Sequence, residues 1–92
     1  MSSSRFIITV IGIDKVGIVA GITQTMAQYN VNIVDISQTI MDDLFTMIML
    51  AQINEDNFDL AAFQQAMSAK GEALGVEVKV QNEDAFRFMH RI

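Results

Sequence analysis

Seven residues, 12–18 (GIDKVGI), form the part of this sequence with the clearest potential for chemistry. A helix is expected to begin after Gly17, and the N-terminus of a helix presents free backbone N–H groups that attract a carboxylate. Asp14 adds a fixed negative charge beside them, and Asn32, at the start of the next expected strand, adds a side-chain amide nearby. These groups could bind the ammonium and carboxylate groups of an α-amino acid. The alternative is that Asp14 only caps the helix and Asn32 only ends a turn.

The same loop lacks the residues of a phosphate-binding loop. Its two glycines match the ends of G-x-x-x-x-G, but Ile18 and Val19 stand where a nucleotide-binding loop has Lys followed by Ser or Thr. Acylphosphatase chemistry, which is known on a ferredoxin-like fold, would need an arginine in this loop. The charged residues present are Asp14 and Lys15, so the sequence argues against both kinds of phosphate chemistry.

Catalytic and metal-binding groups are scarce in the rest of the sequence. The chain has no cysteine and one histidine, His90, which stands two residues from the end and is expected to serve as a cation at a helix terminus. Asp42 and Asp43 could hold a hard cation, but a solvated turn between two strands is the favoured interpretation. The methionines at core-like positions are expected to fill the core: Met26, Met47, Met49, Met67 and Met89. We therefore expect a protein that is not an enzyme and that holds no metal or cofactor.

The composition argues against further classes of partner. The chain has 92 residues, 51% of them hydrophobic, and a formal net charge of −5. Binding to nucleic acid or to an anionic membrane needs a basic surface, so we expect neither. The sequence has no apolar run of about 18 residues that would span a membrane, and its start, MSSSR, is not typical of a signal peptide. We expect a cytoplasmic protein with one domain, residues 5–92, after a flexible N-terminus, residues 1–4.

The spacing of the apolar residues predicts seven elements. The expected strands are residues 6–11, 31–41, 44–53 and 76–81, and the expected helices are residues 18–29, residues 60–74 and a short one from residue 83. Gly12 is expected to break the first strand, and a bulge near Ile33–Asp35 to correct the phase of the second. Asn30 and Gly75 are expected to end the two long helices, and the acidic residues of 54–59 to cap the second one.

The order β-α-β-β-α-β with a terminal helix is typical of an α+β, ferredoxin-like sandwich. Its four-stranded antiparallel sheet would have the first and third strands in the centre, because these two runs are apolar in both phases. Two helices would cover one face, with a short C-terminal helix in addition. The apolar side chains of the other face then need the C-terminal helix or a second subunit as cover, so a C2 homodimer is expected.

Three stretches carry a resemblance to a known family: residues 13–20 (IDKVGIVA), 29–33 (YNVNI) and 35–38 (DISQ). This pattern of a strand, a D-[KR]-x-G-[IV]-V turn, a helix and an N-I strand start resembles the ACT domain. It is most similar to the small stand-alone ACT proteins of the UPF0237 type. The ACT domains of formyltetrahydrofolate deformylase and of glycine-cleavage regulatory proteins are similar here. The resemblance covers about residues 5–90, and its specific part is residues 10–40.

The resemblance implies a regulatory module that binds an amino acid or a similar small metabolite at a homodimer interface and signals to a separate protein. In serine-binding members, side chains of the first loop and an Asn at the start of the second strand hold the ligand. The positions carried over to this sequence are Gly12, Ile13, Asp14, Gly17, Ile18 and Asn32. Gly12 stands where those members have histidine, and Asp14 where they have asparagine. The other hypotheses are a ligand-independent protein–protein interaction module and a small enzyme that uses His90.

Overall fold

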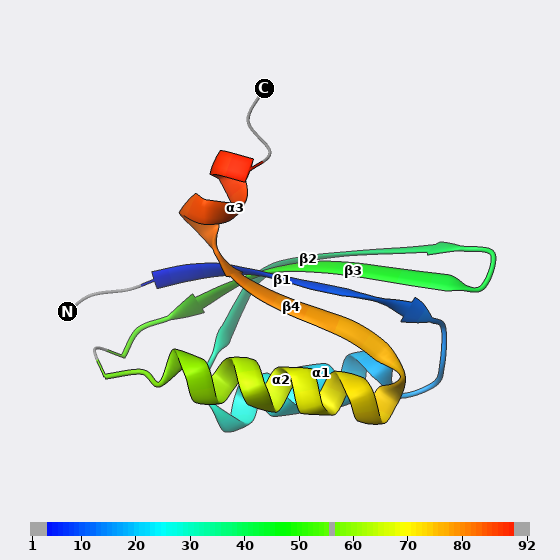
Figure 1. Cartoon of the computed structure of the whole chain (residues 1–92), viewed down its shortest axis with the longest axis horizontal. Helices are drawn as coiled ribbons and strands as arrows, with labels where there is room; N and C mark the ends of the chain where they lie inside the picture. The colour runs from blue at the N-terminus through cyan, green and yellow to red at the C-terminus, as the bar shows by residue number, and fades with distance from the viewer. Residues whose placement is uncertain (1–3, 56, 90–92) are drawn as a thin grey trace.

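The elements follow one another as β-α-β-β-α-β-α in the computed structural model, which describes residues 4–55 and 57–89. They are β1 (Ser4–Ile13), α1 (Ile18–Gln28), β2 (Asn32–Met41), β3 (Leu44–Ile53), α2 (Leu60–Leu74), β4 (Val76–Asn82) and α3 (Glu83–Met89). The strands form one antiparallel sheet in the order β2-β3-β1-β4. Figure 1 shows α1 and α2 on one side of this sheet and α3 on the other. The predicted ferredoxin-like architecture is confirmed.

The two central strands, β1 and β3, carry apolar side chains on both faces of the sheet. Residues directly opposite each other in an antiparallel pair point to the same face. Val10 and Met47 are such a pair, and both are fully buried under the helices. Ile11 and Thr46 form the next pair, so they point to the other face. The two runs that are apolar in both phases therefore form the two central strands, as predicted.

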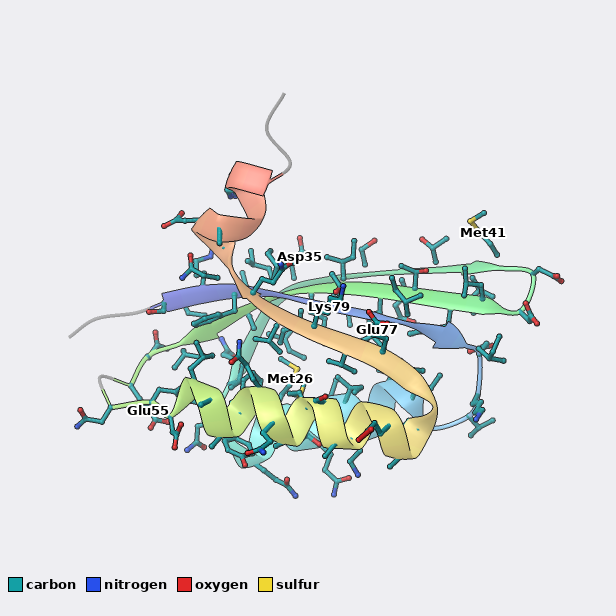
Figure 2. The ribbon with its side chains drawn as sticks, in the orientation of Figure 1. Met26, Asp35, Met41, Glu55, Glu77 and Lys79 are labelled. Atoms are coloured by element: carbon teal, nitrogen blue, oxygen red, sulfur yellow. The ribbon has the colours of Figure 1, made fainter. Side chains whose placement is uncertain are left out.

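The core lies between the sheet and the two long helices. Ile22 and Met26 of α1 and Phe63 and Met67 of α2 pack there against the inward side chains of the strands. Figure 2 shows Met26 between the helices and the sheet. Full burial of each such side chain contributes roughly 1.5–3 kcal/mol of transfer free energy. Four of the five methionines predicted to pack in the core are buried: Met26, Met47, Met49 and Met67. The side chain of Met89 lies outside the described ones.

Left-handed backbone conformations mark the turns that shape the chain. Asn30 has a φ of 58° just after α1, and Asp42 has a φ of 58° in the turn between β2 and β3. Gly75, with a φ of 77°, ends α2 and donates its N–H to the carbonyl of Glu72. The predicted ends of both helices and the predicted turn are confirmed.

A bulge interrupts the pairing of β2 with β3. The register shifts between Ile33 and Asp35, so Val34 has no direct partner on β3. The carboxylate of Asp35 accepts a hydrogen bond of 2.8 Å from the N–H of Ile36. The predicted bulge is confirmed, and it returns the isoleucines on both sides of it to the helix-facing side of the sheet.

Side-chain caps begin the last two helices. The carboxylate of Asp59 accepts a hydrogen bond of 3.0 Å from the N–H of Ala62 at the start of α2. Within the predicted capping cluster of residues 54–59, Asp59 is therefore the cap. The side chain of Asn82 accepts a hydrogen bond of 2.9 Å from the N–H of Asp84 at the start of α3. In the described part of the chain, no helix is long and apolar enough to cross a membrane.

β1 is longer than predicted at both ends. It begins at Ser4, which the sequence places in a flexible terminus, and it runs through Gly12 to Ile13. Gly12 pairs with Phe45 on one side and with Val76 on the other. The prediction that Gly12 breaks the strand is wrong, because strands on both sides hold this glycine in the ladder. Residues 1–3 lie outside the described part of the chain.

Gly71 lies within α2 and faces the start of β4. A Cβ at this position would lie 2.8 Å from the carbonyl oxygen of Val76 and 2.8 Å from a methyl group of Val78. A glycine inside a helix costs roughly 1 kcal/mol relative to alanine, and the structure explains why it is there. α2 and β4 approach each other too closely here for a side chain at position 71.

Gly71→Ala is expected to lower the free energy of unfolding by about 1–3 kcal/mol, because the added methyl group forces the backbone of β4 to move. Urea denaturation followed by circular dichroism measures this loss. Gly21→Ala in α1 is the matched control, since its Cβ would meet the flexible end of Leu74 at 3.0 Å. We expect the control to be neutral or stabilising by up to about 1 kcal/mol. Equal stability of Gly71→Ala and the wild type would contradict the close approach.

Candidate functional site

Two turns flank the loop between β1 and α1 at one end of the sheet. The N–H of Asp14 donates a hydrogen bond of 2.8 Å to the carbonyl of Asp43, in the turn between β2 and β3. The loop also contacts the turn between α2 and β4. The ammonium nitrogen of Lys15 lies so close to Gly75 that a Cβ on this glycine would be 2.8 Å from it. The loop is therefore positioned by two segments that lie far from it in the sequence.

The N-terminus of α1 is exposed within this loop. Gly17 precedes the helix in the left-handed conformation, with a φ of 93°, and a Cβ there would meet nothing within 4 Å. Glycine is therefore needed for its conformation and not for space. No described side chain caps α1, and its first turn has no acidic residue. The interpretation that Asp14 only caps this helix is therefore wrong, and the first N–H groups keep the partial positive charge of a helix N-terminus.

The side chains of the loop differ in exposure. Asp14 and Lys15 are exposed, whereas Ile18 is 2% exposed and anchors the start of α1 in the core. Ile13 is the last residue of β1 and is half exposed on the face away from the long helices. One negative side chain and one positive helix terminus thus stand on the same short loop. This arrangement can accept an ammonium group and a carboxylate at once.

Gly12 contributes backbone to this end of the sheet. A Cβ at this position would lie 2.6 Å from Cγ1 of Val76 and 2.9 Å from its Cα. Such distances leave no room for a side chain unless the start of β4 moves. If Gly12 contributes to ligand binding as predicted, it does so through its backbone atoms.

Asn32 lies at the opposite end of the sheet from the loop. It pairs with Gln52, which pairs with Arg5, whereas Gly12 pairs with Phe45. Arg5 and Gly12 are seven residues apart on one strand, which at about 3.3 Å per residue is about 23 Å. The prediction that Asn32 lies near the loop within one chain is wrong. β2 runs parallel to β1, so it starts at the end where β1 starts.

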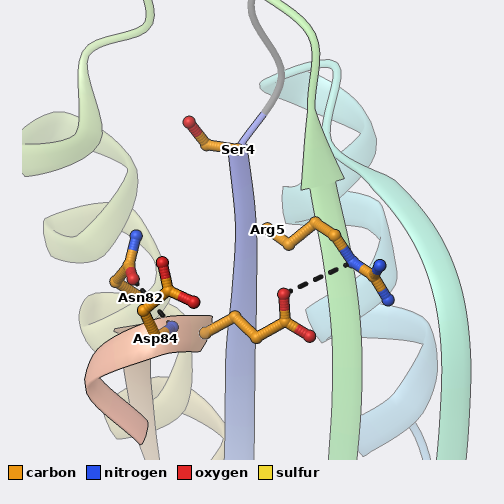
Figure 3. Close-up of a pocket in the computed structure, with 5 residues that line it drawn as sticks. Ser4, Arg5, Asn82 and Asp84 are labelled. Carbon is orange, nitrogen blue, oxygen red and sulfur yellow. Dashed lines mark hydrogen bonds and ion pairs between the residues drawn. The ribbon is translucent and has the colours of Figure 1, made fainter. Parts of the chain in front are cut away.

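A polar depression occupies the end of the sheet where β1 starts. It has a volume of about 240 Å³ and is lined by Ser4, Arg5, Asn82, Glu83 and Asp84 (Figure 3). The carboxylate of Glu83 lies 3.7 Å from Nε of Arg5 and 3.0 Å from a guanidinium nitrogen of Arg87. The two cations that could attract an anionic ligand thus share one carboxylate. This depression is the weaker candidate for a ligand site.

The other predicted candidates for chemistry do not form a site among residues 4–55 and 57–89. No three His, Asp or Glu side chains in this part of the chain are placed to hold a metal ion. Asp42 and Asp43 form an exposed turn, and Asp43 uses its backbone carbonyl to hold the loop. His90 lies outside the described residues.

Comparison with known proteins shows the family of this chain. A family model described as the ACT domain matches residues 4–81. The chain belongs to the ACT family. A UPF0237 protein of Methanosarcina mazei is 78% identical over 92 residues, which is 100% of both chains. An ACT domain protein from Streptococcus pneumoniae has a TM-score of 0.80 at 36% identity, over 92% of this chain and 96% of that chain.

Two larger proteins share the ACT fold at lower identity. A putative glycine cleavage system transcriptional repressor has a TM-score of 0.79 at 18% identity, over 89% of this chain and 47% of that chain. A formyltetrahydrofolate deformylase from Pseudomonas putida KT2440 has a TM-score of 0.75 at 18% identity, over 84% of this chain and 28% of that chain. At these identities the likeness shows the fold alone. The predicted resemblance to the ACT domain and to UPF0237 proteins is confirmed.

Two contacts of the loop in this ACT domain are missed by reasoning from the sequence. Asp43 takes part through its backbone carbonyl, which no side-chain pattern reveals. The placement of Lys15 beside Gly75 depends on the fold, which brings the end of α2 next to the end of β1. The positive charge of Lys15 near the C-terminus of a helix is favourable, but the sequence indicates no partner for it.

Gly12→Ala is expected to lower the free energy of unfolding of this ACT domain by about 1–3 kcal/mol, because its methyl group would overlap Val76. Urea denaturation measures the change. Ile13→Val, at the next and half-exposed position, is the control and should change stability by less than about 0.5 kcal/mol. If Gly12→Ala unfolds at the same urea concentration as the wild type, the close contact between β1 and β4 is not present in solution.

Proposed function

We propose that this protein is a regulatory ACT domain that has no enzymatic activity. It binds an amino acid or a similar small metabolite at a homodimer interface and signals to a separate protein in the cytoplasm. The observation that carries the proposal is the exposed and uncapped N-terminus of α1 at Gly17, on the same loop as the carboxylate of Asp14. Membership of the ACT family, whose members are typically regulatory, supports it.

The chemistry of the loop favours a zwitterion as the ligand. The backbone N–H groups of Gly17 and Ile18 receive the ligand's carboxylate, because the helix N-terminus carries partial positive charge. The carboxylate of Asp14 pairs with the ammonium group. Backbone of Gly12 and Ile13 borders the ligand where β1 ends. A dicarboxylate or a phosphate is disfavoured, since Asp14 would repel it.

Asn32 joins this site from a second subunit. Within one chain it stands about 23 Å from the level of Gly12. If two copies of β2 pair antiparallel across a twofold axis, the start of one β2 lies beside the end of the other. Asn32 of the partner subunit is then brought to the end of the sheet where the loop lies. The homodimer therefore completes a site that one chain holds only in part.

The exposure of β2 supports a contact along this edge. All ten residues of β2 are exposed. Ile33, Ile36 and Ile40 point to the helix side of the sheet, where α1 leaves them 36%, 39% and 55% exposed. Apolar side chains on a free edge strand are unfavourable in a monomer and are covered when another strand pairs with that edge.

A ligand-independent protein–protein interaction module is the second candidate function. The observation that favours it is the apolar sheet face that α1 and α2 do not cover, with Ile11, Ile13 and Ile48 exposed. In that case a partner protein binds equally well with and without added amino acids. A dependence of partner binding on one amino acid favours the regulatory function instead.

The test of the proposed site is a calorimetric screen of the common amino acids against wild type and Asp14→Ala. We expect at least one amino acid to bind the wild type, and Asp14→Ala to weaken its binding at least tenfold, because a charge-assisted hydrogen bond contributes about 1.5–3 kcal/mol. Asn32→Ala should weaken binding as well.

Asp43→Ala is the matched control for this screen. It removes an equal charge from the neighbouring turn but keeps the backbone carbonyl that holds Asp14, so it should bind like the wild type. Binding that is unchanged in Asp14→Ala, or the absence of binding by any amino acid, would refute the assigned site.

A further inference from the structure

The face of the sheet that neither long helix covers holds a shallow depression beside the bulge of β2. This depression has a volume of about 140 Å³ and is lined by Ile7, Asp35, Ile36, Ser37, Ile48 and Leu50. These residues come from the three neighbouring strands β1, β3 and β2. Ile7 stands five residues before Gly12 on β1, which is about 17 Å. The depression is therefore separate from the loop between β1 and α1.

Aliphatic side chains form the floor of this depression. Ile7 of β1 pairs with Leu50 of β3, and Ile48 lies in the next row of the same face. Ile7 and Leu50 are half-buried, whereas Ile48 is 43% exposed. A hydrocarbon chain that lies on these side chains is removed from water, and this removal favours binding.

Two polar side chains of β2 stand at one edge of the depression. Asp35 pairs with Leu50, and Ser37 pairs with Ile48 in the next row. Both therefore point to the same face as the aliphatic floor, and Figure 2 shows Asp35 on the side away from α1 and α2. One carboxylate oxygen of Asp35 accepts the hydrogen bond of 2.8 Å from the N–H of Ile36. This bond orients the carboxylate and leaves its second oxygen for another donor.

The carboxylate of Asp35 forms no ion pair with another residue of the ranges 4–55 and 57–89. The ion pairs in these ranges are made by Glu83, with two arginines, and by Glu77, with Lys79. The pair of Lys79 and Glu77 lies on β4, three strands away from β2, which is about 14 Å. Asp35 therefore gives the aliphatic floor a negative neighbour, which attracts a cation and repels an anion.

We propose that this depression binds a small aliphatic amine in its protonated form. The ammonium group donates hydrogen bonds to the free carboxylate oxygen of Asp35 and to the hydroxyl of Ser37. The hydrocarbon chain of the amine lies on the aliphatic floor. This site goes beyond the proposed function, because it uses neither the loop between β1 and α1 nor the N-terminus of α1.

The volume of the depression limits the length of the amine. A water molecule takes about 30 Å³ of the liquid, so 140 Å³ has room for about five atoms of similar size. n-Butylamine, with four carbon atoms and one nitrogen, meets this limit. Near neutral pH its amino group is charged, as that of a lysine side chain is.

The test is a titration of the whole isotope-labelled chain with n-butylamine near neutral pH, followed by NMR of the backbone amides. We expect the amide signals of Asp35, Ile36, Ser37 and Leu50 to shift and to saturate. Methylamine, which has the charge without the chain, should bind at least about tenfold more weakly, because each buried CH₂ group strengthens binding about fourfold. Butyrate, which has a chain of the same length and the opposite charge, should leave these signals unchanged.

Asp35→Asn separates the charge of Asp35 from its role in the bulge, because asparagine also offers an oxygen to the N–H of Ile36. We expect this variant to bind n-butylamine about two- to fivefold more weakly, the usual range for an exposed ion pair. Asp43→Asn removes an equal charge from an exposed turn and should bind like the wild type. Ser37→Lys places an ammonium group beside Asp35 and should abolish binding. It takes the place of Asp35→Asn if that variant does not fold.

Three results overturn the proposal: no shift of the four amide signals, equal binding by the wild type and the folded Asp35 or Ser37 variant, or equal shifts with butyrate. Amino acid calorimetry of the same folded variant separates this site from the proposed function. The variant should bind amino acids like the wild type, because Asp14 and Gly17 are unchanged. A chain that binds n-butylamine but no amino acid refutes the proposed function alone.

Discussion

A four-stranded sheet has two faces to cover, and this chain has two long helices that both lie on the same one. This unequal cover determines which side chains the central strands carry on each face. The central strands β1 and β3 must be apolar on the helix side to make a core, where Val10 and Met47 are fully buried. They are apolar on the other side as well, where Ile11 and Ile48 stay exposed. A fold of this kind has more apolar surface than one chain covers, which supports the proposed association with a second copy.

The contact between β1, α2 and β4 sets the geometry at the end of the sheet where the loop between β1 and α1 lies. Gly12 on the neighbouring strand and Gly71 on α2 both lie against Val76, and a Cβ on either glycine would lie within 3 Å of it. This packing brings the turn at Gly75 beside the loop, where Lys15 reaches it. The bond from Asp14 to Asp43 holds the loop on its other side. These two contacts fix the position of the short loop, and with it the exposed start of α1.

Most of the fold follows from patterns that are local in the sequence. The apolar runs of residues 6–11 and 44–53 predict the central strands, and the broken phase after Ile33 predicts the bulge. The position of the bulge follows because a slip of one residue would turn every later side chain of β2 to the wrong face. The helix ends at Asn30 and Gly75 follow from the backbone preferences of these two residue types.

The errors arise where distant segments meet. Gly12 suggests the end of a strand, but the close approach of Val76, 64 residues later, gives this glycine its role. Asn32 is close to the loop in sequence, yet the parallel course of β1 and β2 puts it at the far end of the sheet. Neither fact is visible in a local pattern. The loop from Asp14 to Gly17 could be located from its residue types, whereas its neighbours could not.

The bulge at Val34 also limits how this protein can aggregate. β2 is a free edge of ten residues with several exposed isoleucines, and such an edge is a template for uncontrolled strand addition. At the bulge, the regular ladder of hydrogen-bonding groups is broken, and the carboxylate of Asp35 already occupies the N–H of Ile36. An incoming strand therefore meets an interrupted ladder at residues 34–36, whereas the stretches of β2 on either side of the bulge can still pair. The edge offers an interrupted ladder of hydrogen-bonding groups, which opposes the regular strand addition of a growing fibre.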